Sequence, residues 1–194
     1  SILREARKVT QMHDFKGYIS DLGGPSANMY GMHGRNLDIC KKCLRPSCLH
    51  PKPCPNLNTD HSQLLDIYHA VDALPGVKKS FIGSGVRYDL SMHPTGDPHT
   101  DAVNRRYNEE LIEHHVSGRL KVAPEHTCPR VLNIMRKPDF SLFHAFKRIF
   151  DSRSSPILSR RIPDAMRSTW PSSPPRPSSS TSTSNRCRIS RLRP

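Results

Sequence analysis

Apolar side chains return every three or four residues in several parts of the chain, which is the spacing of an amphipathic helix. The segments with this pattern are 1–12, 60–74, 100–115 and, beginning at Thr127 or Cys128, a shorter one that Pro138 closes. Aromatic residues recur at similar intervals over 139–150, and their spacing predicts core packing against a sheet. The first 151 residues therefore have the pattern of one domain or of part of a larger one.

Three short strands are predicted between these helices, over residues 15–21, 78–86 and 120–122. In the third, Leu120 and Val122 alternate with Lys121, which is the period of a strand. Strands that alternate with helices along a chain are joined by crossover connections, and these connections make the strands parallel. The predicted fold class is therefore α/β, with a parallel sheet.

Each predicted strand ends in residues suited to contact a ligand. They are Gly23 and Gly24 after the first strand, Ser84 and Arg87 at the end of the second, and Glu125 and His126 after the third. Ligands of parallel sheets bind at the carboxyl ends of the strands, so these residues are candidates for a binding site. The plainer alternative is a set of ordinary turns with solvated side chains and, at Arg87, an ordinary ion pair.

Three motifs at these strand ends resemble the YgiQ family of radical S-adenosylmethionine (SAM) proteins. They are I-S-D-L-G-G-P-S-A-N-M-Y at 19–30, S-G-V-R-Y-D at 84–89 and V-A-P-E-H-T at 122–127, the last followed by V-L-N-I-M-R-K-P. The resemblance covers essentially all of residues 1–151. It implies a partial (β/α) radical SAM barrel, of which this chain holds strands two to four of six.

The resemblance also implies cofactors and a pocket. Radical SAM enzymes combine a [4Fe-4S] cluster, SAM and an external electron donor to start radical chemistry on a substrate, which is unknown here. The residues that the resemblance assigns to SAM are Gly23 and Gly24 for the amino acid moiety, and Ser84, Arg87, Glu125 and His126 for the rest of the pocket. Pro25 replaces an acidic residue of the standard motif, which puts one side-chain contact in doubt. No residue is assigned to catalysis.

The C-x₃-C-x₂-C motif of the radical SAM cluster does not occur in this chain. By the resemblance it would lie just before Ser1, so we expect a fragment of an enzyme that is inactive by itself. The sequence also shows neither a signal-peptide pattern nor an apolar run of transmembrane length, and the expected location is the cytoplasm.

Four cysteines lie in a loop predicted over 34–58, an insertion between the first strand and the next helix. They are Cys40, Cys43, Cys48 and Cys54, in the pattern C-x₂-C-x₄-C-x₅-C. Thiolates this close together can bind zinc or an iron–sulfur cluster, although the spacing matches no standard motif of either kind. A second metal in this loop and ordinary reduced thiols are therefore both open.

The net charge of +13 is unevenly distributed. Residues 1–150 contain 21 Lys and Arg against 15 Asp and Glu, hence +6, whereas residues 151–194 contain 9 against 2, hence +7. More than half of the excess therefore belongs to the Arg-, Ser- and Pro-rich tail, 152–194, whose composition predicts disorder.

The tail also allows a different hypothesis, a slip of the reading frame near Asp151. Codons for residues 185–194 can be chosen so that the neighbouring frame reads Q-V-Q-D-F-T-P-T-P, which resembles the sixth strand of the YgiQ family. Residues 157–165 can likewise yield Y-F-I-S-S-H-P-G-C, which resembles the fifth. If the tail is out of frame, its charge is accidental and binding to nucleic acid is not favoured.

Two other classes of function remain open. The first is a small zinc-binding module that uses the four cysteines and a basic surface for nucleic acid. The second is the non-functional product of a damaged gene, which would bind no ligand. The substrate, the identity of any metal in the cysteine loop and the oligomeric state do not follow from the sequence.

Overall fold

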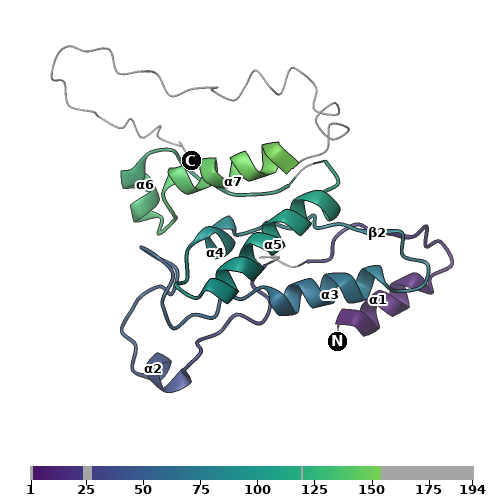
Figure 1. The fold of residues 1–194 in the computed structure, drawn as a ribbon, viewed down its shortest axis with the longest axis horizontal. Coiled ribbons are helices and arrows are strands. Elements are labelled where there is room, and N and C mark those ends of the chain that lie inside the picture. The colour runs from purple at the N-terminus through teal and green to yellow at the C-terminus, as the bar shows by residue number, and fades with distance from the viewer. Residues whose placement is uncertain (1, 24–27, 119, 154–194) are drawn as a thin grey trace, which may run out of the picture.

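Helices make up most of the regular structure, as the ribbon in Figure 1 shows. The computed structural model describes residues 2–23, 28–118 and 120–153. The helices are α1 (Ile2–Thr10), α2 (Leu37–Lys41), α3 (Ser62–Asp72), α4 (Tyr88–Met92), α5 (Pro98–His114), α6 (Pro129–Ile134) and α7 (Phe140–Arg153). The strands are β1 (Tyr18–Ile19) and β2 (Lys79–Ser80).

The two strands pair in parallel, with Ile19 opposite Ser80. The pairing continues beyond them, because the amide of Phe81 donates to the carbonyl of Ile19 at 2.9 Å and the amide of Leu22 donates to the carbonyl of Phe81 at 2.7 Å. The first two predicted strands therefore exist and run in the predicted direction, but they are shorter than the pattern indicated.

A third extended segment joins this arrangement where Val86 forms a parallel bridge with Val122. The amide of Val86 donates to the carbonyl of Lys121 at 3.0 Å. Between β2 and this bridge lie Gly83 and Gly85, and residues without a side chain to pack weaken a strand. Three parallel segments thus follow one another as predicted, while their closure into a barrel stays a prediction.

Helices α1, α3, α5 and α6 lie where the apolar pattern predicts helices. Helix α5 begins earlier than predicted, at Pro98, because the side chain of Asp97 accepts hydrogen bonds from the amides of His99 (3.2 Å) and Thr100 (3.1 Å). An Asp cap followed by Pro in the first turn is a favourable start for a helix. The pattern missed α2 and α4, which have five residues each and are too short to show a repeat.

The main core lies where α3 and α5 pack together beside β2 (Figure 1). Tyr68 of α3 and Leu111 of α5 are fully buried there, together with Ile82 and Val86 from the segment after β2. The buried stripes predicted for these two helices are confirmed. They hold the segment from β2 to Val86 in place, and this segment leads to the candidate site.

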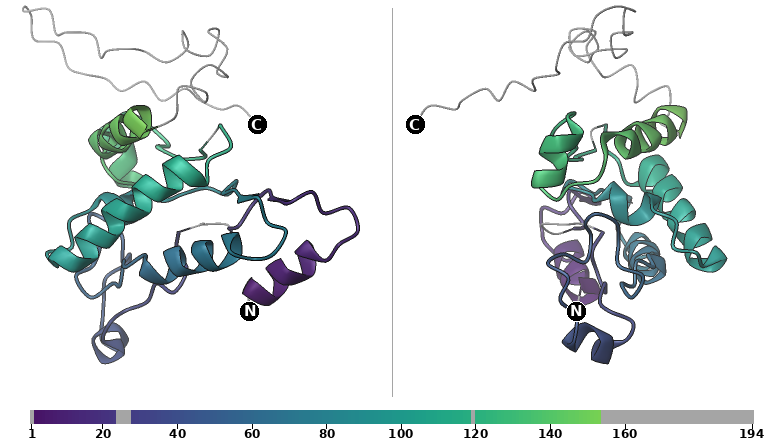
Figure 2. Two further views of the ribbon diagram at one scale, coloured as in Figure 1. Left: turned by 45° about the vertical axis from the view of Figure 1, so that its right-hand side comes forward. Right: turned by 90° about the vertical axis from the view of Figure 1, so that its left-hand side faces the viewer.

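A second core forms where α7 packs against α4 and α5, and both views in Figure 2 show α7 beside α5. Phe143 and Phe146 are buried, and the ring of Phe146 stacks on Tyr88 of α4 at a centroid distance of 5.7 Å. Leu120 and Val122 of the third extended segment pack against the same cluster. The predicted aromatic core is therefore present, but its main partners are helices α4 and α5 and not the predicted sheet, of which the third extended segment alone contributes side chains to the cluster in the described residues.

Within the described part of the chain, no helix has the length and apolar character needed to span a membrane. Helix α7 extends to Arg153 and so includes the first two residues of the predicted tail. The rest of the tail, from 154 to 194, lies outside the described residues, as do the two segments from which the frame hypothesis was argued.

Candidate functional site

The predicted binding residues follow three neighbouring parallel segments. Gly23 follows β1, Ser84 and Arg87 follow β2, and Glu125 comes three residues after the bridge at Val122. Because parallel strands direct their carboxyl ends to the same edge, these residues belong to one edge of the sheet. His126 is next to Glu125 in the same turn, and Gly24 lies outside the described residues.

Asp21 connects the end of β1 to the end of the second segment. Its carboxylate accepts hydrogen bonds from the amides of Gly83 (2.9 Å) and Ser84 (3.1 Å) and from the hydroxyl of Ser84 (2.5 Å). Partial burial would raise the pKa of Asp21, but these hydrogen bonds together hold it below its ordinary value. The Ser84 side chain thus has a fixed acceptor on the segment that leads to Gly23.

Asn28 makes a second connection to the same segment. Its Oδ1 accepts from the amide of Arg87 at 2.8 Å, and its Nδ2 donates to the carbonyl of Arg87 at 2.9 Å. Asp21 and Asn28 therefore flank Gly23 and Gly24 in sequence, and both bind the 83–87 segment. Neither residue was among the predicted ligands, although both lie inside the 19–30 motif.

Arg87 uses its side chain for an ion pair with Asp89. Its Nε lies 3.1 Å from Oδ1 and its Nη2 lies 2.5 Å from Oδ2 of that carboxylate. Asp89 is buried, and its side chain is 8% exposed, against 27% for Arg87. The ordinary ion pair proposed as the plainer alternative is therefore present, and it fixes the direction of the guanidinium.

Glu125 has an unusual backbone conformation for a residue with a side chain, with φ at 64°. Such left-handed geometry costs about 1–3 kcal/mol and is concentrated at functional turns. The carboxylate lies 2.9 Å from Nζ of Lys137, and both side chains are about one-third exposed. His126 is exposed, and its Nδ1 accepts from the amide of Cys128, the residue that caps α6. The turn is therefore built by its polar side chains and not merely solvated.

The four cysteines of the 34–58 loop do not come together as a ligand set. Cys40, Cys43 and Cys48 are exposed and Cys54 is half-buried. The Sγ of Cys40 accepts from Nδ2 of Asn56 at 3.1 Å, and the amide of Cys54 donates to the carbonyl of Cys48 at 2.7 Å. In residues 2–23, 28–118 and 120–153, no group of three or more His, Cys, Asp or Glu side chains is arranged to hold a metal ion. A metal in this loop remains a prediction without a preformed site.

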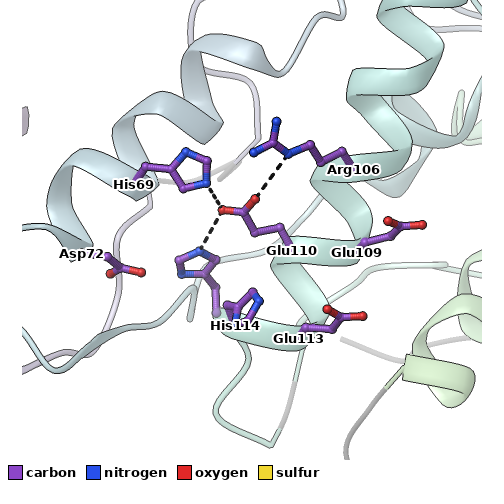
Figure 3. A pocket seen from close by; sticks show the side chains of 8 residues that line it. His69, Asp72, Arg106, Glu109, Glu110, Glu113 and His114 are labelled. Carbon is purple, nitrogen blue, oxygen red and sulfur yellow. Dashed lines mark ion pairs between the residues drawn. The ribbon is translucent and has the colours of Figure 1, made fainter.

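A surface pocket of about 390 Å³ lies elsewhere, between α3 and α5, and Figure 3 shows its side chains. Glu110 is central: its carboxylate lies 2.5 Å from Nε2 of His69, 3.9 Å from Nε of Arg106 and 4.0 Å from Nε2 of His115. Arg106 is the charged partner of Glu110 in this group, while His69 and His115 approach the carboxylate through ring nitrogens. The sequence-predicted site residues do not line it.

Two buried histidines make the protein sensitive to acid, and we expect its stability to fall below about pH 6.5. Burial lowers the pKa of His61 and of His115, even though hydrogen bonds, to Asn104 and to the Ser80 carbonyl respectively, oppose the shift. In the unfolded chain both imidazoles take up protons from about pH 6.5 downwards, earlier than in the folded protein. The stability is therefore complete above this pH and is lost as the pH falls toward the lowered values.

Urea unfolding at about pH 7.5 and 5.5 measures this loss. The substitution His115→Gln should make it smaller, because glutamine does not titrate. His13 is exposed, so His13→Gln should leave the loss unchanged. If the unmodified protein and both variants lose the same free energy of unfolding between the two pH values, the buried imidazole of His115 does not cause the loss.

The chain is similar to UPF0313 proteins over most of its length. It is 64% identical over 165 residues to one from Bacteroides thetaiotaomicron, a match that covers 84% of this chain and 27% of that protein. The relative from Porphyromonas gingivalis is 58% identical over 150 residues, covering 77% and 24%, and the one from Methanosarcina mazei is 45% identical over 152 residues, covering 78% and 23%.

The chain thus spans about a quarter of the length of the curated relatives that it matches. This proportion is consistent with the predicted fragment. Neither a protein-family profile nor a solved structure matches the chain.

Proposed function

We propose that this chain is part of a radical SAM enzyme of the YgiQ type, and that the edge formed by residues 21–23, 83–87 and 124–126 contributes to its SAM pocket. The observation that carries the proposal is the joining of the motifs at this edge. Asp21 binds Gly83 and Ser84, and Asn28 binds both backbone groups of Arg87. Ser84 and Arg87, which the resemblance assigns to the SAM pocket, are therefore held by direct contacts from the 19–30 motif. The same motif carries Gly23, which the resemblance assigns to the same ligand.

The edge offers polar groups, and one open position, that suit a ligand such as SAM. SAM carries a carboxylate, an ammonium group, a sulfonium cation and ribose hydroxyls, so it needs donors and anions in the same pocket. Arg87 offers donors, whereas Asp21 and Glu125 offer carboxylates. A Cβ added at Gly85 would meet nothing within 4 Å, so the strand end is open at that point. These features support the assignment.

The described residues do not fit the [4Fe-4S] cluster, because they contain no group arranged to hold a metal. The proposal therefore assigns the cluster to residues outside this chain and derives nothing from it here. SAM, when bound, would supply the radical chemistry of the class.

The contribution of this chain is to orient SAM. Asp89 fixes the direction of the Arg87 guanidinium, and Asp21 is a fixed acceptor for the Ser84 hydroxyl. These polar groups are therefore in place before the ligand arrives, which reduces the entropy cost of binding. Gly23 is exposed and follows Asp21 in the same segment, with no side chain to obstruct a ligand. The Glu125 turn closes the edge on the other side.

The proposal is tested by SAM binding in the full-length protein with its cluster reconstituted, since the relatives are about four times as long as the matched region. SAM at about 100 times its Kd should stabilise the protein by about 2.7 kcal/mol, seen as a rise in Tm. Gly85→Val fills the open space at the strand end and should abolish most of this rise, with Gly85→Ala between the two. Absence of both SAM binding and reductive SAM cleavage in the unmodified protein would refute the proposal.

A further inference from the structure

A chain of buried side chains connects α5 to the main chain of Arg87. Asn28, His61 and Asn104 are each no more than 1% exposed. Asn28 Nδ2 lies 3.2 Å from His61 Nε2, and His61 Nδ1 lies 2.7 Å from Asn104 Oδ1. The His61 ring stacks on Tyr107 of α5 at a centroid distance of 4.3 Å. The family resemblance assigns no role to any of these side chains.

The contacts between Asn28 and Arg87 fix the direction of every other hydrogen bond in this series of side chains. The amide of Arg87 can only donate and its carbonyl can only accept, so Oδ1 and Nδ2 of Asn28 are fixed. The second N–H of Nδ2 then points to His61, whose Nε2 must accept it. Therefore Nδ1 of His61 carries the proton and donates it to Oδ1 of Asn104. Neutral His61 in this tautomer satisfies both contacts.

We propose that Asn28, His61 and Asn104 are positioning residues for the SAM pocket: they hold the main chain of Arg87, and protonation of His61 releases it. This inference rests on the proposed function for its ligand but not for its geometry. Asp89 fixes the Arg87 side chain. Among the side chains of the described residues, Asn28 alone forms hydrogen bonds with the Arg87 backbone. Both contacts are needed to set where the guanidinium lies.

Protonation breaks the chain because it converts an acceptor into a donor. A proton on Nε2 of His61 would face the N–H of Asn28, which cannot turn round without losing both contacts with Arg87. The stacked Tyr107 ring and the Asn104 amide of α5 face His61 and are neutral, and the carboxylate of Asp60 is its sequence neighbour. Burial lowers the pKa of His61, so the neutral form is the one present at neutral pH.

The geometry is tested by hydrogen exchange at the Arg87 amide in the full-length protein, with no ligand present. Asn28→Ala should speed exchange there about tenfold or more, because the amide loses its acceptor. Asn108 offers a matched control: it is also buried, at 2% exposed, and lies one turn after Asn104 on α5, but its Oδ1 accepts from Ser91. Asn108→Ala should leave the Arg87 amide protected. Equal exchange at Arg87 in the unmodified protein and Asn28→Ala would overturn the inference.

The functional part is tested by SAM affinity in the same proteins. Asn28→Ala should weaken binding about tenfold, and Asn108→Ala should not. In the unmodified protein the affinity should fall as the pH drops through the pKa of His61, which burial holds below its ordinary value. The variant His61→Gln, which offers one donor and one acceptor without a titrating proton, should keep its affinity there. If His61→Gln loses SAM affinity at low pH as the unmodified protein does, the release step is refuted. If the unmodified protein fails to bind SAM, the proposed function is refuted, and Arg87 exchange still decides the positioning.

Discussion

Replacing Leu111 with alanine is expected to lower the free energy of unfolding by about 2–5 kcal/mol. Leu111 is 0% exposed and lies in the core cluster with Leu65, Ile82 and Val86. The substitution removes most of the side chain from the contact between α5 and the segment after β2. The loss has two parts, the transfer free energy of the missing methyl and methylene groups and the cavity that they leave.

The chain offers a matched control in Leu44 of the cysteine loop, a residue that is 97% exposed. Leu44→Ala removes the same atoms from water and should change the free energy of unfolding by less than about 0.5 kcal/mol. Urea unfolding of both variants measures the difference. Similar values for the two substitutions would mean that α5 does not pack on α3 and on the segment after β2 in the way described.

The apolar pattern identified α3 and α5 because each has a long stripe of buried residues, among them Tyr68 and Leu111. Strand positions were also found, since β1 and β2 lie inside the predicted ranges. Strand lengths were not, because strand pairing depends on neighbours far away in sequence. Gly83 and Gly85 illustrate this: they fit a strand by position but contribute no packing.

The site was predicted less completely than the fold. Resemblance drew attention to Ser84, Arg87 and Glu125, which do lie at the strand ends. It gave no reason to select Asn28 or His61, because an asparagine or a histidine in isolation has no characteristic pattern. Their roles come from hydrogen bonds between residues 33 positions apart. The four-cysteine loop is the opposite case, where a suggestive spacing is not accompanied by an assembled ligand set.

Replacing Arg87 with alanine is expected to lower the free energy of unfolding by about 3 kcal/mol, near the lower end for breaking a buried ion pair. The substitution leaves the Asp89 carboxylate, 8% exposed, without its cationic partner. The partial exposure of Arg87 reduces the effect, because water can partly replace the guanidinium. Denaturant unfolding of the variant measures the loss.

A matched control is Arg153→Ala on α7. Arg153 also pairs with carboxylates, those of Glu109 and Glu113, but these three side chains are 37–41% exposed. Exposed pairs contribute about 0–1 kcal/mol, so this substitution should have a much smaller effect. Adding Asp89→Asn to Arg87→Ala should recover part of the stability, because it removes the unpaired charge. Equal losses in Arg87→Ala and Arg153→Ala would contradict the burial of the Arg87–Asp89 pair.

The same variants separate stability from ligand binding at Arg87. Arg87→Ala removes both the ion pair and the proposed contact with SAM, so a loss of affinity in this variant alone is ambiguous. Asp89→Asn weakens the ion pair but keeps the guanidinium and the contacts of Asn28 with the Arg87 backbone. If Arg87 binds SAM, Asp89→Asn should lose less affinity than Arg87→Ala, because it keeps the guanidinium and an amide oxygen that can still accept from it. If both variants lose affinity equally, the function of Arg87 is to fix Asp89 and the turn into α4, and its place in the SAM pocket must be given up.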